Sequence, residues 1–215
     1  MAGSMPSDPE ILAFIDRTEA FYPADAASQP VEKQREFYNA LCADFRGVRP
    51  DDISVTDDTV QSNDPDWAIP VRIYQHKDRA VSGTALLYIH GGGFVVGGLE
   101  SHDDLCGLLC HETGVTIVAV DYRLAPEHVY PAQLDDVACV YDALRETYER
   151  VLAGGDSAGG CLAAALCVDA VDLKNAEAHS SNEKAEHNSE TEYKSDCQIH
   201  GSYPYIRIQV FNPNP

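Results

Sequence analysis

Three short apolar runs, each followed by a segment with helical periodicity, constrain the fold of this chain more than any other feature. The runs are TALLYIH at 84–90, VTIVAVDY at 115–122 and RVLAGG at 150–155. The helical segments are 100–114, 131–148 and the alanine-rich stretch that follows residue 157. Strands that are apolar on both faces and alternate with helices are typical of a parallel sheet covered by helices on both sides. The sequence therefore predicts an α/β fold.

The rest of the chain divides into segments of different character. Residues 8–22 and 31–45 place apolar side chains at helical spacing, while 52–60 and 69–76 alternate like the strands of an outer hairpin. We expect a helical N-terminal segment at 1–50 and an α/β core at 51–171. The polar, acidic tract at 172–200 is expected to be disordered or loosely helical. Alternating apolar residues predict one further strand within 201–215.

The third apolar run leads directly into the sequence GDSAG, with Ser157 between Gly155 and Gly159. Small residues two places before and two places after a serine allow a tight turn between strand and helix, which lifts the hydroxyl clear of its own backbone. Such a serine can act as a nucleophile when a base lies beside it. The alternative is a serine that only caps the following helix. The strand before the motif and the helical segment after it favour the nucleophile.

The first apolar run ends in a second glycine motif, HGGGFVVGG at 90–98. Consecutive glycines expose backbone N–H groups, and such donors stabilise the negative charge that develops on an ester carbonyl oxygen when a serine attacks it. The alternatives are a flexible turn or a phosphate cradle. No lysine with P-loop spacing follows the glycines, which disfavours the phosphate cradle.

These motifs resemble those of the hormone-sensitive-lipase-like family, or family IV, of α/β-hydrolase carboxylesterases. The matching stretches are YIHGGGFVVGG, VDYRLAPEHVYPAQLDD and AGGDSAGGCLAAAL, in the family's order. The resemblance implies an α/β-hydrolase fold in which the N-terminal helices contribute to a cap. It also implies a serine esterase that acts on short or medium acyl esters through an acyl-enzyme.

The resemblance assigns roles to individual residues. Ser157 would be the nucleophile, and the backbone N–H groups of Gly92, Gly93 and Ala158 would form the oxyanion hole. The supporting motif residues are His90, Gly91, Gly155, Asp156 and Gly159. The family's catalytic base follows the serine in the chain, whereas His90 precedes it. His90 would therefore organise the glycine loop, the segment 90–98. Arg123 and Glu127 are expected to be paired scaffold residues.

The acid and base of the expected triad are not visible as motifs after Ser157. Asp196 and His200 are weak candidates, and His200 directly precedes the strand-like tail. Other residues of the right type are Asp169, Asp172, His179 and His187. Without a base the serine keeps only a small part of its activity. Three explanations stay open: a truncated or mis-assembled esterase, which we favour, a noncatalytic small-molecule binder of this fold, or a partner chain that completes the sheet.

Composition excludes several other classes of protein. The formal net charge of −20 disfavours nucleic acid and anionic membrane surfaces as partners. No stretch of the sequence is long and apolar enough to span a bilayer, and no secretory signal is recognised, so we expect a cytoplasmic protein. The seven cysteines lack the spacing of a zinc site or a disulfide framework and are expected to be reduced and mostly buried. No metal or cofactor is expected, and the oligomeric state is left open.

Overall fold

The computed structural model describes residues 8–168 and 209–211 of the chain. Its elements, in chain order, are α1 (Pro9–Glu19), the 3-10 turn η1 (Ala26–Ser28), α2 (Val31–Phe45), β1 (Ile53–Gln61), β2 (Ala68–His76), β3 (Thr84–Ile89), α3 (Asp103–Thr113), β4 (Thr116–Val120), α4 (Ala132–Thr147), β5 (Arg150–Gly155) and β6 (Gln209–Phe211). A further helix at 158–168 follows β5 directly. Helices and strands thus lie where the periodicity of the sequence predicts them.

The strands form one mixed sheet in the order β1-β2-β4-β3-β5-β6. The three apolar runs are its parallel centre, because β3 pairs in parallel with both β4 and β5. Strands β1 and β2 form the outer antiparallel hairpin, and β2 connects this hairpin to the rest of the sheet by pairing antiparallel with β4. The short strand β6 pairs antiparallel with β5 and falls in the segment where one more strand is expected. The remaining residues of the polar tract and tail lie outside the described part of the chain.

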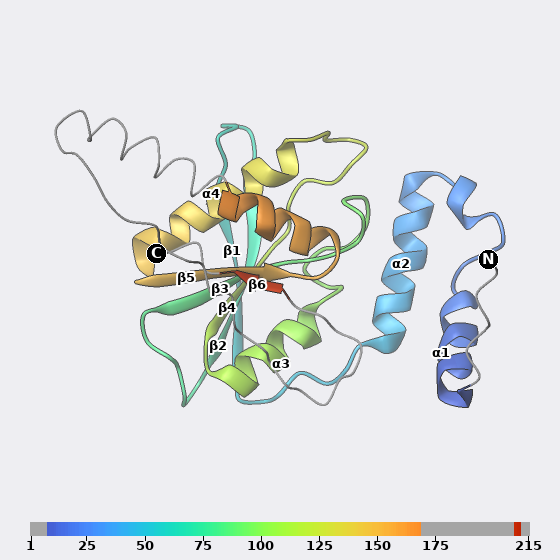
Figure 1. Ribbon diagram of the computed structural model, residues 1–215, viewed down its shortest axis with the longest axis horizontal. Coiled ribbons are helices and arrows are strands. Elements are labelled where there is room, and N and C mark those ends of the chain that lie inside the picture. Colours follow the sequence, from blue (N-terminus) through green and yellow to red (C-terminus); the bar gives the residue numbers. More distant parts are fainter. Residues whose placement is uncertain (1–7, 169–208, 212–215) are drawn as a thin grey trace, which may run out of the picture.

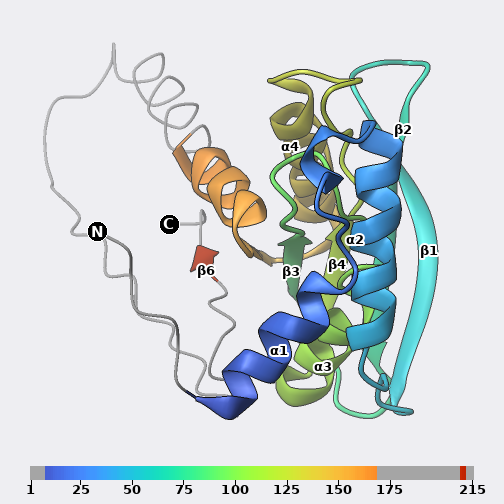
Figure 2. The same cartoon turned by 90° about the vertical axis from the view of Figure 1, so that its right-hand side faces the viewer.

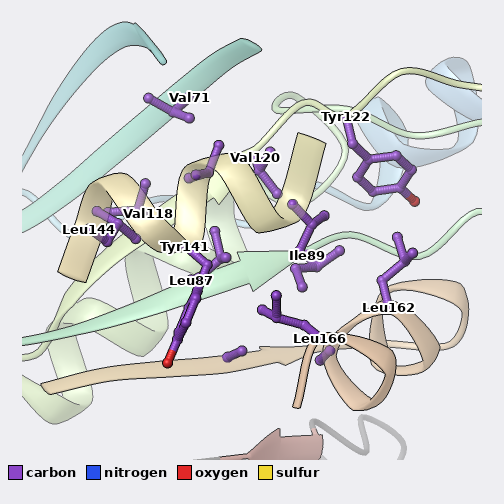
Figure 3. Packing of buried hydrophobic residues seen from close by; sticks show 14 of the residues in the cluster. Val71, Leu87, Ile89, Val118, Val120, Tyr122, Tyr141, Leu144, Leu162 and Leu166 are labelled. Atoms are coloured by element: carbon purple, nitrogen blue, oxygen red, sulfur yellow. The ribbon is translucent and has the colours of Figure 1, made fainter. Parts of the chain in front are cut away.

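Helices cover both faces of this sheet (Figure 1), as the apolar strands predict. One face packs against α4 and the helix at 158–168, and the other packs against α3. Alternate residues of β3 separate accordingly: Leu87 and Ile89 belong to the first cluster, whereas Leu86 and Tyr88 belong to the second. Figure 3 shows Leu87 and Ile89 in the first cluster. This two-sided core fixes the carboxyl ends of β3 and β5, where both glycine motifs begin.

The N-terminal helices lie apart from this core. Figures 1 and 2 place α1 and α2 on the side of the sheet where β5 runs into the turn that carries Ser157. Neither helix contains a fully buried residue. Their apolar faces meet each other through ring contacts, such as Phe14 with Phe45, whose centroids are 5.3 Å apart.

The cysteines are less buried than the sequence predicts. All six in the described residues are free thiols, but only Cys106 and Cys110 are buried. The helix at 158–168 exposes Cys161, because that residue falls on the helix face away from the sheet. Among the described residues, no helix is both long and apolar enough to cross a membrane.

Candidate active site

Ser157 occupies a strained turn at the end of β5. Its φ angle of 50° lies in the left-handed region, which residues with a β-carbon rarely adopt, and the residue is exposed. The turn passes very close to the end of β3. A Cβ at Gly155 would lie 2.0 Å from the carbonyl oxygen of Ile89, and one at Gly159 would lie 1.9 Å from the same oxygen. Both glycines are therefore needed for the turn to form.

The glycine loop after β3 is held in an unusual conformation of its own. Gly92, Gly93 and Phe94 have φ angles of 120°, 60° and 65°. The carbonyl of Gly92 accepts hydrogen bonds from the N–H groups of Val95 and Val96, each at 3.0 Å. This closed turn leaves the N–H groups of Gly92 and Gly93 with no acceptor among the described residues. The same holds for the N–H of Ala158, in the first turn of the helix after the serine. These three groups are the donors that the sequence predicts for an oxyanion hole.

Asp156 ties the two loops together. Its Oδ1 accepts hydrogen bonds from the N–H of Gly91 at 2.9 Å and from the hydroxyl of Tyr88 at 2.9 Å. His102 Nε2 lies 3.2 Å from the same oxygen. Burial acts to raise the pKa of Asp156, but His102, Tyr88 and the Gly91 N–H together hold it at about 2. Asp156 is thus an ionised carboxylate that holds the ends of β3 and β5 together, and we refer to it as the ionised clamp.

His90 lies beneath the loop as a buried, neutral support. Only 2% of the residue is exposed. Its Nδ1 donates to the carbonyl of Gly91 at 2.7 Å, and its ring stacks on Tyr122, whose hydroxyl donates to the His90 carbonyl at 2.8 Å. Burial lowers the pKa of His90 to about 4, so the ring is uncharged at neutral pH. This arrangement suits a residue that shapes the loop.

The arrangement of a serine turn beside a glycine loop can be compared with known proteins. A family model described as alpha/beta hydrolase fold matches residues 86–189, a range that contains both glycine motifs. The described residues have the α/β-hydrolase fold. Ethyl acetate hydrolase of Pseudomonas putida is 37% identical over 178 residues, which cover 75% of this chain and 55% of that protein. An acetyl esterase of Salmonella typhi is 31% identical, over 73% of this chain and 49% of that protein.

Solved esterase structures have the same fold. An esterase from the archaeon Pyrobaculum calidifontis aligns with a TM-score of 0.68 and 29% identity, covering 79% of this chain and 56% of that one. An arylesterase aligns with a TM-score of 0.71 and 27% identity, covering 79% and 57%. The chain spans about half the length of the curated relatives it matches.

Arg123 and Glu127 form ion pairs with other partners than expected. Arg123 does not pair with Glu127. It binds Asp136 of α4 through Nε and Nη2, at distances down to 2.8 Å, while Glu127 binds Arg35 of α2. Arg123 and Glu127 both lie in the loop after β4, but Arg123 connects that loop to α4 and Glu127 connects it to α2. Nothing in the local pattern around Arg35 indicates this long-range contact.

The candidate acid and base of the triad are not placed by the structure. Asp196 and His200 lie outside the described residues, as do Asp169, Asp172, His179 and His187. Their roles stay predictions.

One cluster of histidines and a carboxylate in the described part of the chain has the composition of a metal site. Asp52, His76 and His111 bring one ligand atom each within 4.8 Å of one another. However, Nδ1 of His76 already accepts the N–H groups of both Asp78 and Arg79 at 3.1 Å. Nε2 in turn accepts a hydrogen bond from Arg79 Nε at 3.0 Å, which places a cationic guanidinium where the metal ion would have to bind. The cluster does not fit a metal ion.

Proposed function

We propose that the chain is a serine carboxylesterase that hydrolyses short or medium acyl esters through an acyl-enzyme on Ser157. The observation that supports this most strongly is the joining of the two loops: Asp156 Oδ1 accepts the Gly91 N–H at 2.9 Å, one residue before the exposed, strained serine. This contact sets the serine turn beside the unpaired amides of the glycine loop. The names of the relatives, an ethyl acetate hydrolase and an acetyl esterase, favour an ester hydrolase over a noncatalytic binder.

The proposed reaction has two steps. The Ser157 oxygen attacks the ester carbonyl carbon, and the C=O electron pair moves onto oxygen, where the N–H groups of Gly92, Gly93 and Ala158 stabilise the charge. The intermediate collapses with cleavage of the bond to the alcohol, which leaves with the proton that the serine gave up. Water then attacks the acyl-serine and releases the carboxylic acid. A base must carry these protons, and Asp196 and His200 are the acid and base that we propose to test first.

The test is covalent labelling of Ser157 with a fluorophosphonate probe, in which the serine oxygen bonds to phosphorus and fluoride leaves. Wild-type protein should be labelled at Ser157, and the Ser157→Ala variant should not. Ser54→Ala is the matched control, because Ser54 lies on the edge strand β1 and its hydroxyl donates only to the Gln75 carbonyl. Hydrolysis of p-nitrophenyl acetate by the same three proteins measures turnover. Folded wild-type protein that is neither labelled nor active would instead support the noncatalytic binder.

A further inference from the structure

The side chain of Arg35 connects the N-terminal helices to the glycine loop. From α2, its Nε donates to the carbonyl of Val95 at 2.8 Å. Its Nη2 donates to the carbonyl of Ala125 at 2.9 Å, and its two terminal nitrogens donate to the two carboxylate oxygens of Glu127 at 2.8 and 2.7 Å. One guanidinium thus joins α2, the glycine loop and the loop after β4.

The glycine loop needs such support from outside. Three successive residues, Gly92, Gly93 and Phe94, have positive φ angles, and a phenylalanine in that conformation is strained. Strained backbone persists only where the surrounding structure holds it. Two carbonyls are held by groups from elsewhere in the chain: the N–H of Ala125 donates to the Phe94 carbonyl at 2.8 Å, and Arg35 donates to the Val95 carbonyl.

Arginine is suited to this role because its planar fork can reach several acceptors at once. The carboxylate of Glu127 binds both terminal nitrogens and so sets the plane of the Arg35 guanidinium. That orientation leaves Nε directed at the Val95 carbonyl. Since α2 has no fully buried residue, polar contacts of this kind have a large share in docking the helix.

We propose that Arg35 is a positioning residue that couples the docking of α2 to the conformation of the oxyanion loop. When α2 is seated, the Val95 carbonyl is held and the N–H groups of Gly92 and Gly93 are presented to the substrate. When Arg35 is lost, the loop samples other conformations although the sheet is intact. The catalytic part of this inference rests on the proposed esterase function.

Hydrogen exchange measured by mass spectrometry tests the coupling without requiring turnover. Arg35→Ala should make the peptide that contains residues 91–96 exchange about tenfold faster, the effect expected for losing one hydrogen bond that opposes local opening. Peptides from β3 and β5 should exchange as in wild type. The matched control is Arg17→Ala, which removes an arginine of α1 whose Nε binds Asp44 at 2.6 Å and which has no contact with the loop.

The outcomes separate the coupling from general stability. Faster exchange confined to 91–96 in Arg35→Ala, with no change there in Arg17→Ala, supports the proposal. Unchanged exchange at 91–96, or equally faster exchange in β3 and β5, would overturn it.

Labelling by the fluorophosphonate probe tests the catalytic consequence. The maximal labelling rate at saturating probe should fall about tenfold in Arg35→Ala, while the probe concentration at half-maximal rate changes little, because the loop acts on the developing charge. A rate equal to that of wild type would contradict the catalytic role of the coupling. If wild-type protein is not labelled at all, the esterase proposal fails, and the exchange experiment still decides whether Arg35 orders the loop.

Discussion

At the scale of single residues, Ser157 and Phe94 are the only non-glycine residues of the described chain with a positive φ angle, and both lie in the proposed site. Replacing Ser157 with glycine removes the β-carbon that makes this conformation costly, whereas Ser157→Ala keeps it. We expect Ser157→Gly to be more stable than Ser157→Ala by about 1 kcal/mol in urea unfolding. Equal stabilities would mean that the serine turn is not strained.

Asp156 should make the stability of the protein sensitive to acid. Its pKa of about 2 in the folded state is below the value of about 3.9 for an unfolded aspartate, so folding favours the charged form. Its contribution is therefore complete above about pH 4 and is lost as the pH falls toward 2. The difference in unfolding free energy between wild type and Asp156→Asn should shrink from pH 5 to pH 3 and further below it. A difference that grows over this range would show that Asp156 is not the ionised clamp described above.

At the scale of elements, the close approach of the serine turn to β3 should tolerate no side chain. Gly159→Ala would place a methyl group 1.9 Å from the backbone oxygen of Ile89, which cannot move without breaking the sheet. We expect a loss of about 3 kcal/mol or more in unfolding free energy. Gly93→Ala is the control, because a Cβ there meets nothing within 4 Å and only its φ angle of 60° is unfavourable. That variant should lose about 1 kcal/mol. The reverse order of the two losses would rule out this packing.

Helix α4 offers a second comparison, between a buried and an exposed ion pair. The Asp136 side chain is fully buried against Arg123, whereas Asp142 lies on the exposed face, 3.8 Å from Arg145. Asp136→Ala leaves the largely buried Arg123 guanidinium with only the longer ion pair to Asp64, at 3.9 Å, and should lower the unfolding free energy by about 3 kcal/mol. Asp142→Ala should change it by less than about 1 kcal/mol. Thermal or urea unfolding of the two variants measures both, and similar losses would disprove the structural role of Asp136.

The elements themselves could be predicted because local pattern determines them. The helical spacing of Phe37, Tyr38 and Leu41 predicts a helix over 31–45, and α2 has these bounds. The long-range polar contacts could not be predicted in this way. Arg35 and Glu127 are 92 residues apart in the chain and meet only because α2 docks beside the loop after β4. The pairing of Arg123 with Asp136 instead of Glu127 likewise depends on how α4 returns across the sheet.

At the scale of the whole molecule, the fold class could be predicted because apolar strands alternating with helices allow few arrangements, and the glycine motifs indicate where we propose the site. The acid and base could not be located, since a single aspartate or histidine in a polar tract has no local pattern that distinguishes a catalytic residue from a solvated one. The exposure of Cys161 could not be predicted for a similar reason, because the helical sequence around it does not reveal which face of the helix meets the sheet.

The strong acidity of the chain predicts how salt affects the entire fold. Lysine and arginine number 15 against 35 aspartate and glutamate residues, so the compact state carries a large negative self-repulsion at neutral pH. Raising NaCl from about 10 mM to about 500 mM shortens the Debye length from about 30 Å to a few ångströms and screens this repulsion. The buried pair of Arg123 and Asp136 is screened much less. We therefore expect the melting temperature at pH 7 to rise with salt, and to change little near the isoelectric point of about 4.5, where the net charge vanishes. A melting temperature that falls with NaCl at pH 7 would mean that attractive ion pairs outweigh the net charge in stabilising this hydrolase fold.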